Sequence, residues 1–178
     1  MGIPTLISTC TADGDDECVF TSGIDSTYDE YMFVMTNLNP GTNERDLQIQ
    51  FNVSGGSGYN ETITSTVFRA NHNEADDSAA VAYITGADLA QGTTYQTITS
   101  AAGGGADECV SGVLHLFSPS STTYVKHFYC RTSSYGHADQ AEDQFTAGYI
   151  NVTAAIDEVA FEFGEGVFDG VIQMFGIA

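Results

Sequence analysis

The amino-acid sequence predicts an all-β protein, a sandwich or barrel of about eight or more short antiparallel strands. Apolar and polar residues alternate strictly over residues 46–53, DLQIQFNV, as they do in a strand with one buried and one wet face. Clusters of Gly, Pro, Asn and Ser break the chain at residues 39–43, 54–58, 102–107 and 118–121. Helical periodicity is nearly absent, and little helix is expected beyond a turn or two at residues 73–83 and 153–157.

The other strands follow from the same kind of pattern. Residues 31–35, YMFVM, form a continuous apolar run, which is typical of a central strand covered on both faces. Residues 158–163, EVAFEF, alternate so that Val159, Phe161 and Phe163 share one face. Further strands, rich in aromatic and β-branched residues, are expected at residues 112–117, 123–130 and 145–152.

The chain ends on an apolar segment, residues 164–178, GEGVFDGVIQMFGIA. A terminus is normally frayed and polar unless the fold holds it in place. Asp169 and Gly170 form a tight-turn signal with apolar residues on both sides. We therefore expect a hairpin in which this segment returns after residues 158–163 and is buried as the last strand, rather than an exposed apolar patch.

Length and charge limit the class of protein. With 178 residues the chain is predicted to be one domain, residues 1–178, with a short N-terminal strand or arm at residues 1–12. The net charge is -20, from 24 acidic and 4 basic residues. Because so few cations cannot neutralise many phosphates, we expect neither nucleic acid nor a membrane as a partner. The N-terminal sequence has no basic segment followed by a long apolar run, so we expect synthesis in a cytoplasm.

Four cysteines, Cys10, Cys18, Cys109 and Cys130, lack the CxxC spacing of zinc and redox motifs. The pattern favours their interpretation as small buried hydrophobic residues. If disulfides form instead, a Cys10–Cys18 bridge would close a hairpin, and a Cys109–Cys130 bridge would join two neighbouring strands. The connectivity stays open at this point.

One acidic run is a candidate cation site. The segment ADGDDEC holds Asp13, Asp15, Asp16 and Glu17 beside a glycine, and calcium is bound by several carboxylate oxygens. The run begins like an EF-hand loop, but no glycine stands at its sixth place and Ile24 replaces the closing glutamate. These four acids are therefore our candidate Ca²⁺ ligands, with a solvated hairpin tip as the alternative that the pattern favours. The same two interpretations apply to a second cluster, formed by Glu74, Asp76 and Asp77.

The sequence contains no motif of a known catalytic class. GxSxG, HExxH and phosphate-loop patterns are absent, and paired carboxylates carry no information in so acidic a chain. His115 and His127 each fall in a predicted strand and could face one another across a sheet, but no Cys or Asp stands at a metal-ligand spacing. We therefore predict a protein that is not an enzyme and that needs no cofactor besides the candidate Ca²⁺.

A long stretch of the chain resembles a known family. Residues 20–56 open with FTSGID, continue into two tyrosines, a strand and a turn with Pro40, and end in an alternating strand and a glycine-rich loop that leads to Tyr59. Residues 147–163, AGYINVTAAIDEVAFEF, and the ending GVIQMFGI add a second match, since relatives close on a similar G-x-I-x-L-Y-G-I. In these motifs, which span nearly the whole chain, the sequence is similar to a small jelly-roll domain in structural proteins of tailed double-stranded DNA phages, especially those of marine bacteria and cyanobacteria.

The resemblance implies an antiparallel jelly-roll β-sandwich and a place in the virion. Relatives serve as capsid decoration (cement or knob) proteins or as domains of tail fibres. No fibre shaft precedes the predicted domain, which favours a decoration protein on the outer surface of the phage head. Its expected partners are the major capsid protein, other virion proteins and further copies of the chain, as a trimer. The alternative is a tail-fibre or receptor-binding module that binds a host surface glycan through exposed tyrosines such as Tyr95 or Tyr135.

Overall fold

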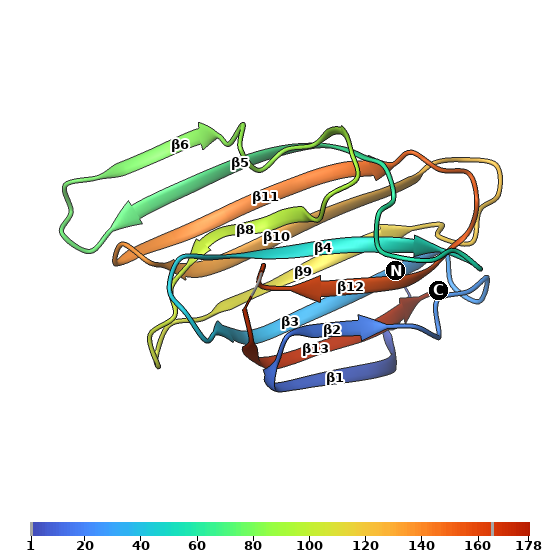
Figure 1. The fold of residues 1–178 in the computed structure, drawn as a ribbon, viewed down its shortest axis with the longest axis horizontal. Coiled ribbons are helices and arrows are strands. Elements are labelled where there is room, and N and C mark those ends of the chain that lie inside the picture. Colours follow the sequence, from blue (N-terminus) through green and yellow to red (C-terminus); the bar gives the residue numbers. More distant parts are fainter. Residues whose placement is uncertain (1, 165) are drawn as a thin grey trace.

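The computed structural model describes residues 2–164 and 166–178. In these ranges the chain forms thirteen β-strands and no helix, and the strands make one nearly closed, barrel-like antiparallel sheet (Figure 1). The predicted all-β class is therefore confirmed. The strands are β1 (Thr5–Asp15), β2 (Glu17–Phe20), β3 (Glu30–Pro40), β4 (Arg45–Val53), β5 (Ile63–Asn73), β6 (Ala79–Tyr83), β7 (Ala90–Gly92), β8 (Gln96–Ala102), β9 (Val110–Phe117), β10 (Lys126–Gly136), β11 (Gln140–Ile150), β12 (Ile156–Glu162) and β13 (Phe168–Ile177).

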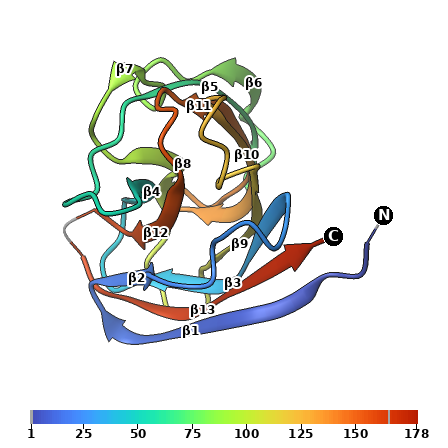
Figure 2. The same ribbon diagram turned by 90° about the vertical axis from the view of Figure 1, so that its right-hand side faces the viewer.

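The sheet folds into two layers. The longer layer has the strand order β1-β13-β3-β9-β10-β11-β5, and both β6 and β7 pair with the far side of β5. The shorter layer has the order β8-β4-β12-β2. The layers are continuous at one corner, where Gly136 of β10 pairs with Ala102 of β8. Seen from the end of the molecule, the two layers curve around a common interior (Figure 2).

Aromatic side chains fill the space between the layers. Phe20 of β2 lies edge-on to Phe33 of β3 and to Phe161 of β12, with ring centroids 5.3 and 6.1 Å apart. Val159, Phe161 and Phe163 are fully buried, so the predicted inner face of residues 158–163 is confirmed. Burial of these large rings is the main contribution of the core to stability.

Two strands depart from the burial predicted for them. β3 is central, but its side chains alternate: Phe33 is buried, whereas Met32 and Val34 are only half-buried on the outer face of the longer layer. In β4 the predicted wet face is partly covered, because Gln50 and Asn52 are buried. Gln50 stays satisfied there, since its Nε2 donates to the carbonyl oxygen of Thr94 at 2.9 Å, which belongs to the loop that covers it.

The C-terminal strand is buried as predicted, but its predicted hairpin is wrong. β13 lies between β1 and β3 in the longer layer, whereas β12 lies between β4 and β2 in the shorter one. Asp169 and Gly170 belong to β13 itself, at a bulge opposite β3 where Gly170 has φ 131°. A Cβ on Gly170 would lie 2.6 Å from the carbonyl oxygen of Asn37, so glycine serves close strand approach here and not a turn.

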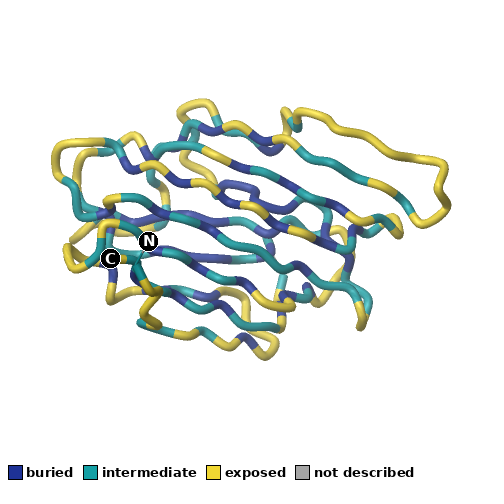
Figure 3. Tube along the Cα trace, turned by 180° about the vertical axis from the view of Figure 1, so that it is seen from behind, coloured by how far each residue is buried: buried dark blue, intermediate teal, exposed yellow. Residues whose placement is uncertain are grey.

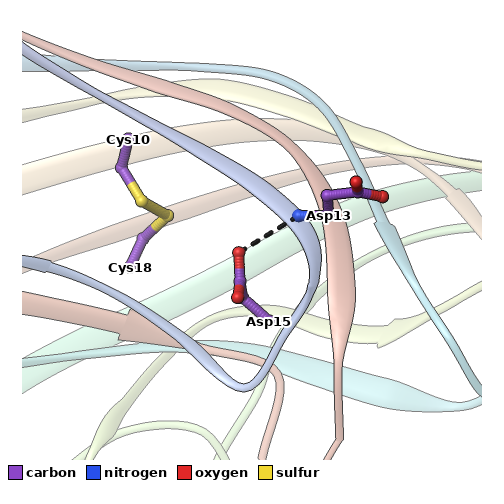
Figure 4. Close-up of a disulfide and its surroundings, with 4 residues drawn as sticks. All are labelled: Cys10, Asp13, Asp15 and Cys18. Carbon is purple, nitrogen blue, oxygen red and sulfur yellow. Dashed lines mark hydrogen bonds between the residues drawn. A yellow bond between two sulfur atoms is a disulfide. The ribbon is translucent and has the colours of Figure 1, made fainter.

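The cysteines also correct the sequence interpretation. Cys10 and Cys18 form a disulfide with their Cα atoms 6.0 Å apart, so they are not merely buried hydrophobic residues (Figure 4). The bridge joins β1, the last strand of the longer layer, to β2, the last strand of the shorter one. A Cys109–Cys130 bridge is ruled out by register, because Cys130 pairs with Leu114 and both thiols are free. Cys130 is buried as expected, which raises the pKa of its thiol.

The predicted helical turns are absent from the described ranges, whereas the N-terminal segment forms a strand, one of the two forms expected for it. Residues 73–83 form a turn and strand β6, and residues 153–157 lead directly into β12. Residues 5–15 form β1, which pairs with β13 as far as Asp15. At residues 73–83 and 153–157 an available neighbouring strand outweighs the weak local preference for helix. The same ranges hold no helix of the length and apolarity needed to cross a membrane.

Candidate functional site

The candidate Ca²⁺ ligands lie at an exposed hairpin tip between β1 and β2. The amide of Asp13 donates to Asp15 Oδ2 at 3.2 Å (Figure 4), and the amide of Gly14 donates to Asp169 Oδ1 at 2.7 Å. Two carboxylates near the tip therefore accept backbone hydrogen bonds. Glu17 begins β2, where it pairs with Glu162 of β12. Among the described residues no three His, Cys, Asp or Glu side chains are grouped so as to hold a metal ion, and the Ca²⁺ site stays a prediction.

The second acidic cluster lies in the turn between β5 and β6. His72 Nε2 is 3.0 Å from Asp76 Oδ1, and Asn73 Nδ2 donates to Asp77 Oδ1 at 2.6 Å. Both acids are exposed and serve local turn geometry. The turn hydrogen bonds thus account for these side chains.

The two strand histidines face tyrosines rather than each other. His115 of β9 pairs with Tyr129 of β10, and their rings stack with centroids 4.6 Å apart. His127 pairs with Tyr149 of β11 at a centroid distance of 6.2 Å. His115 Nδ1 also lies 2.5 Å from Glu30 Oε1, so the imidazole is oriented from one side by a carboxylate and from the other by an aromatic ring.

On the side that faces away from the interior, the longer layer carries two rows of cross-strand neighbours, most of which are apolar. We call these two rows the outer face. The first row crosses five neighbouring strands of the sheet, β1, β13, β3, β9 and β10, which contribute in this order Leu6, Phe175, Met32, His115 and Tyr129. The second row crosses the neighbouring strands β3, β9, β10, β11, β5 and β6, which contribute in this order Val34, Val113, Arg131, Phe145, Phe68 and Tyr83. Several of these side chains are well exposed: Leu6 is 51% exposed, Tyr129 46% and Phe68 45%. Neighbouring exposed apolar side chains of this kind are typical of a site that binds a partner.

The second row is held in place by stacking. The rings of Phe68 and Phe145 are nearly parallel, 6° apart in plane and 4.8 Å apart at their centroids. The guanidinium of Arg131 lies 4.8 Å from the centroid of Phe145 and donates two hydrogen bonds to the carboxylate of Asp143, at 2.9 and 2.7 Å. A planar, paired guanidinium on a ring forms a rigid platform, because each contact restricts the rotamers of the others.

A groove runs along the same face above β9, β10 and β11. It consists of two hollows, of about 550 and 430 Å³, that share Ser111 and Ser133. Small side chains line its floor, while Tyr129, His115 and Arg131 rise at one end and His72 and Tyr135 at the other. The groove thus combines aromatic rings with hydroxyl, imidazole and charged groups, which is the composition of a site for a small polar ligand.

The tyrosines proposed from the sequence for glycan contact are not the exposed ones. Tyr95 and Tyr135 are half-buried, and the Tyr135 hydroxyl donates at 3.2 Å to both Glu74 Oε1 and Asp139 Oδ1. Desolvation, together with the bond to Asp139, raises the pKa of Tyr135 to about 12. The exposed tyrosines include Tyr124, Tyr129 and Tyr83.

The alternation of polar and apolar residues along the strands did not predict the second row. In β11 the polar side chain of Gln144 is almost fully buried and the ring of Phe145 lies outside, which inverts the usual pattern. The only local signal is Val67 followed by Phe68, where a polar residue would have completed the alternation. No protein-family model matches the chain, and no curated protein is significantly similar to it.

Proposed function

We propose that the chain is a non-enzymatic structural protein of a virus particle, a jelly-roll protein that decorates the outside of a tailed phage head. It is made in the host cytoplasm and works in the virion, where it binds the major capsid protein and further copies of itself. The resemblance to the phage family implies that these copies form a trimer. Neither nucleic acid nor a membrane is a partner in this proposal.

The order of strand pairing supports the jelly roll. If the two insertions β5–β7 and β10–β11 are set aside, the remaining eight strands are nested: β1 pairs with β13, β2 with β12, β3 with β9, and β4 with β8. Such nesting is what results when one long antiparallel ribbon rolls up into two facing layers, as in a jelly roll. The five inserted strands extend the longer layer beyond β9.

The observation that carries the proposal is the outer face. Copies of a protein with net charge -20 repel one another through most of their surface, yet here two rows of mostly apolar side chains cross the longer layer. Burying such rows against another surface is favourable at roughly 25 cal/mol for each Å² of apolar area removed from water. A decoration protein needs a broad face of this kind, because it docks onto an assembled shell and performs no chemistry there.

The test is the location and the docking face of the protein. We expect hundreds of copies on the head in a density map of purified particles. The purified chain should bind shells that lack it, and Val34→Glu, which places a charge at the β3 end of the second row, opposite Val113, should abolish that binding. Tyr124→Glu, at a side chain that is 72% exposed and belongs to neither row, is the control and should bind normally. A handful of copies at the tail, or full binding by the Val34 variant, would contradict the proposal.

The groove supports a second candidate, a glycan-binding module of a tail fibre. Aromatic rings such as Tyr129 stack on the apolar faces of sugars, and Arg131, Asp143 and the serine hydroxyls offer donors and acceptors to sugar hydroxyls. For this candidate we expect a host-surface oligosaccharide to perturb NMR signals of Ser111 and Ser133, and Tyr129→Ala to remove the effect. Tyr124→Ala, at an exposed tyrosine outside the groove, is the control.

A further inference from the structure

Strand β6 is an exposed apolar edge. All five of its residues, AAVAY, are exposed, and Val81 is 78% exposed. β6 pairs with β5 on one side, and no described strand pairs with its other side. It forms the outermost arm of the hairpin at the margin of the molecule (Figure 1), and Figure 3 shows that arm exposed over its length. Native proteins normally shield such an edge with charges, proline or a covering segment, because a bare edge pairs with other strands.

The hydrogen-bond phase of the β5–β6 hairpin shows which groups face outward. The amide of Asn73 donates to the carbonyl oxygen of Ser78 at 3.0 Å, and the amide of Ile84 donates to that of Val67 at 2.9 Å. Because hydrogen-bonded positions alternate in an antiparallel pair, Ala80 and Ala82 also direct their backbone groups toward β5. The N–H and C=O groups of the three residues between and beside them therefore point away from the sheet; these are Ala79, Val81 and Tyr83.

We propose that β6 pairs antiparallel with β6 of a second copy of this chain, about a two-fold axis at Val81. In this register Val81 lies opposite Val81 of the second copy, and Ala79 lies opposite Tyr83 of the second copy. All outward N–H and C=O groups then find partners. The side chains also fit, since a small methyl group stands opposite each large ring.

Charge identifies the second copy as the occupant. Residues 78–84, SAAVAYI, contain no charged side chain, although the chain as a whole has net charge -20. Two copies that meet through this segment place no carboxylate opposite another, whereas a contact through the acidic parts of the surface would do so. The pairing is also isologous, so it closes after two copies and leaves no free β6 edge for a third copy. It is independent of the proposed place in a virion and uses a different surface from the groove.

The test compares solution masses at about 0.5 M salt, where repulsion between exposed charges is largely screened. Val81→Lys puts two ammonium groups at the axis but lowers the net negative charge of each copy. If general repulsion governed association, this variant would associate more strongly; edge pairing requires that its mass fall to half that of the wild type. Ile3→Lys makes the same change of charge at another exposed aliphatic residue and should keep the wild-type mass.

A second variant tests the backbone directly. Val81→Pro removes an outward N–H and none of the hydrogen bonds to β5, so it should also halve the mass while the chain stays folded by circular dichroism. A wild-type mass of 18.9 kDa, that of one chain, at millimolar concentration would overturn the proposal. So would an oligomer that Val81→Lys leaves intact, including a trimer, or an equal effect of the Ile3 variant.

Discussion

Glu17 of β2 and Glu162 of β12 lie directly opposite each other in an antiparallel pair. Like charges in this arrangement repel, and desolvation together with Glu17 raises the pKa of Glu162 above its ordinary 4.5. Because the folded state holds this proton more tightly than the unfolded chain, the associated stability is present at acid pH and is lost as the pH rises past 4.5.

Replacing Glu162 by glutamine should therefore stabilise the protein at neutral pH. We expect Glu162→Gln to raise the free energy of unfolding at pH 7 by about 0.5 kcal/mol and to leave it unchanged well below pH 4. Urea denaturation at both pH values measures this. Asp107→Asn makes the same change of net charge at an exposed residue; an equal gain in that variant would show that the effect comes from overall charge and not from the opposed pair.

The disulfide should stabilise the barrel at its open corner. Cys10 and Cys18 join the two terminal strands of the layers, so their bridge restricts the unfolded chain and ties the layers together. We expect Cys10→Ala/Cys18→Ala to lower the free energy of unfolding by about 2 kcal/mol. Reductant should lower the melting temperature of the wild type but not that of the double variant. If reductant acted equally on both, the bridge would have no such role.

Lys126 should stabilise the segment that leads into β12. Its side chain is fully buried, and Nζ donates to the carbonyl oxygens of Val152 and Ala154 at 3.1 and 2.5 Å. Lys126→Met preserves the length of the side chain but leaves both carbonyl groups without this donor. We therefore expect the free energy of unfolding to fall by about 2 kcal/mol. Hydrogen exchange should accelerate at residues 151–155. An unchanged exchange rate there would contradict the role, whatever the global stability.

The second row of the outer face should contribute little to the free energy of unfolding. Phe161 is fully buried, and Phe161→Ala should destabilise the protein by about 3–5 kcal/mol. Phe68 is 45% exposed and has its main contact with Phe145, so Phe68→Ala should lower stability by about 1 kcal/mol. Thermal denaturation of the two variants gives the comparison. Equal losses would mean that the row is part of the structural core and not a surface kept free for a partner.

Part of the candidate site was accessible to sequence analysis and part was not. The acidic tip was found, because a run of acids beside a glycine is a local signal. The groove and the second row were missed, because Phe145 and Phe68 become neighbours only through the pairing of β11 with β5, which are far apart in the chain. Tyr95 and Tyr135 were expected to be exposed, but Tyr135 is held at its hydroxyl by two carboxylates from separate turns.

Local patterns in the chain are enough to predict that it is all-β, where most of its strands run, and that its apolar end is buried, because alternation and turn residues act within a few positions of one another. The insertion of β13 between β1 and β3, the bond between Cys10 and Cys18, and the outward position of Phe145 beside the buried Gln144 follow from contacts between distant segments. Local patterns cannot predict these contacts because a strand has two faces and two edges. Its own residues define them, but the neighbouring strands and the opposite layer decide which face is covered and which edge is paired.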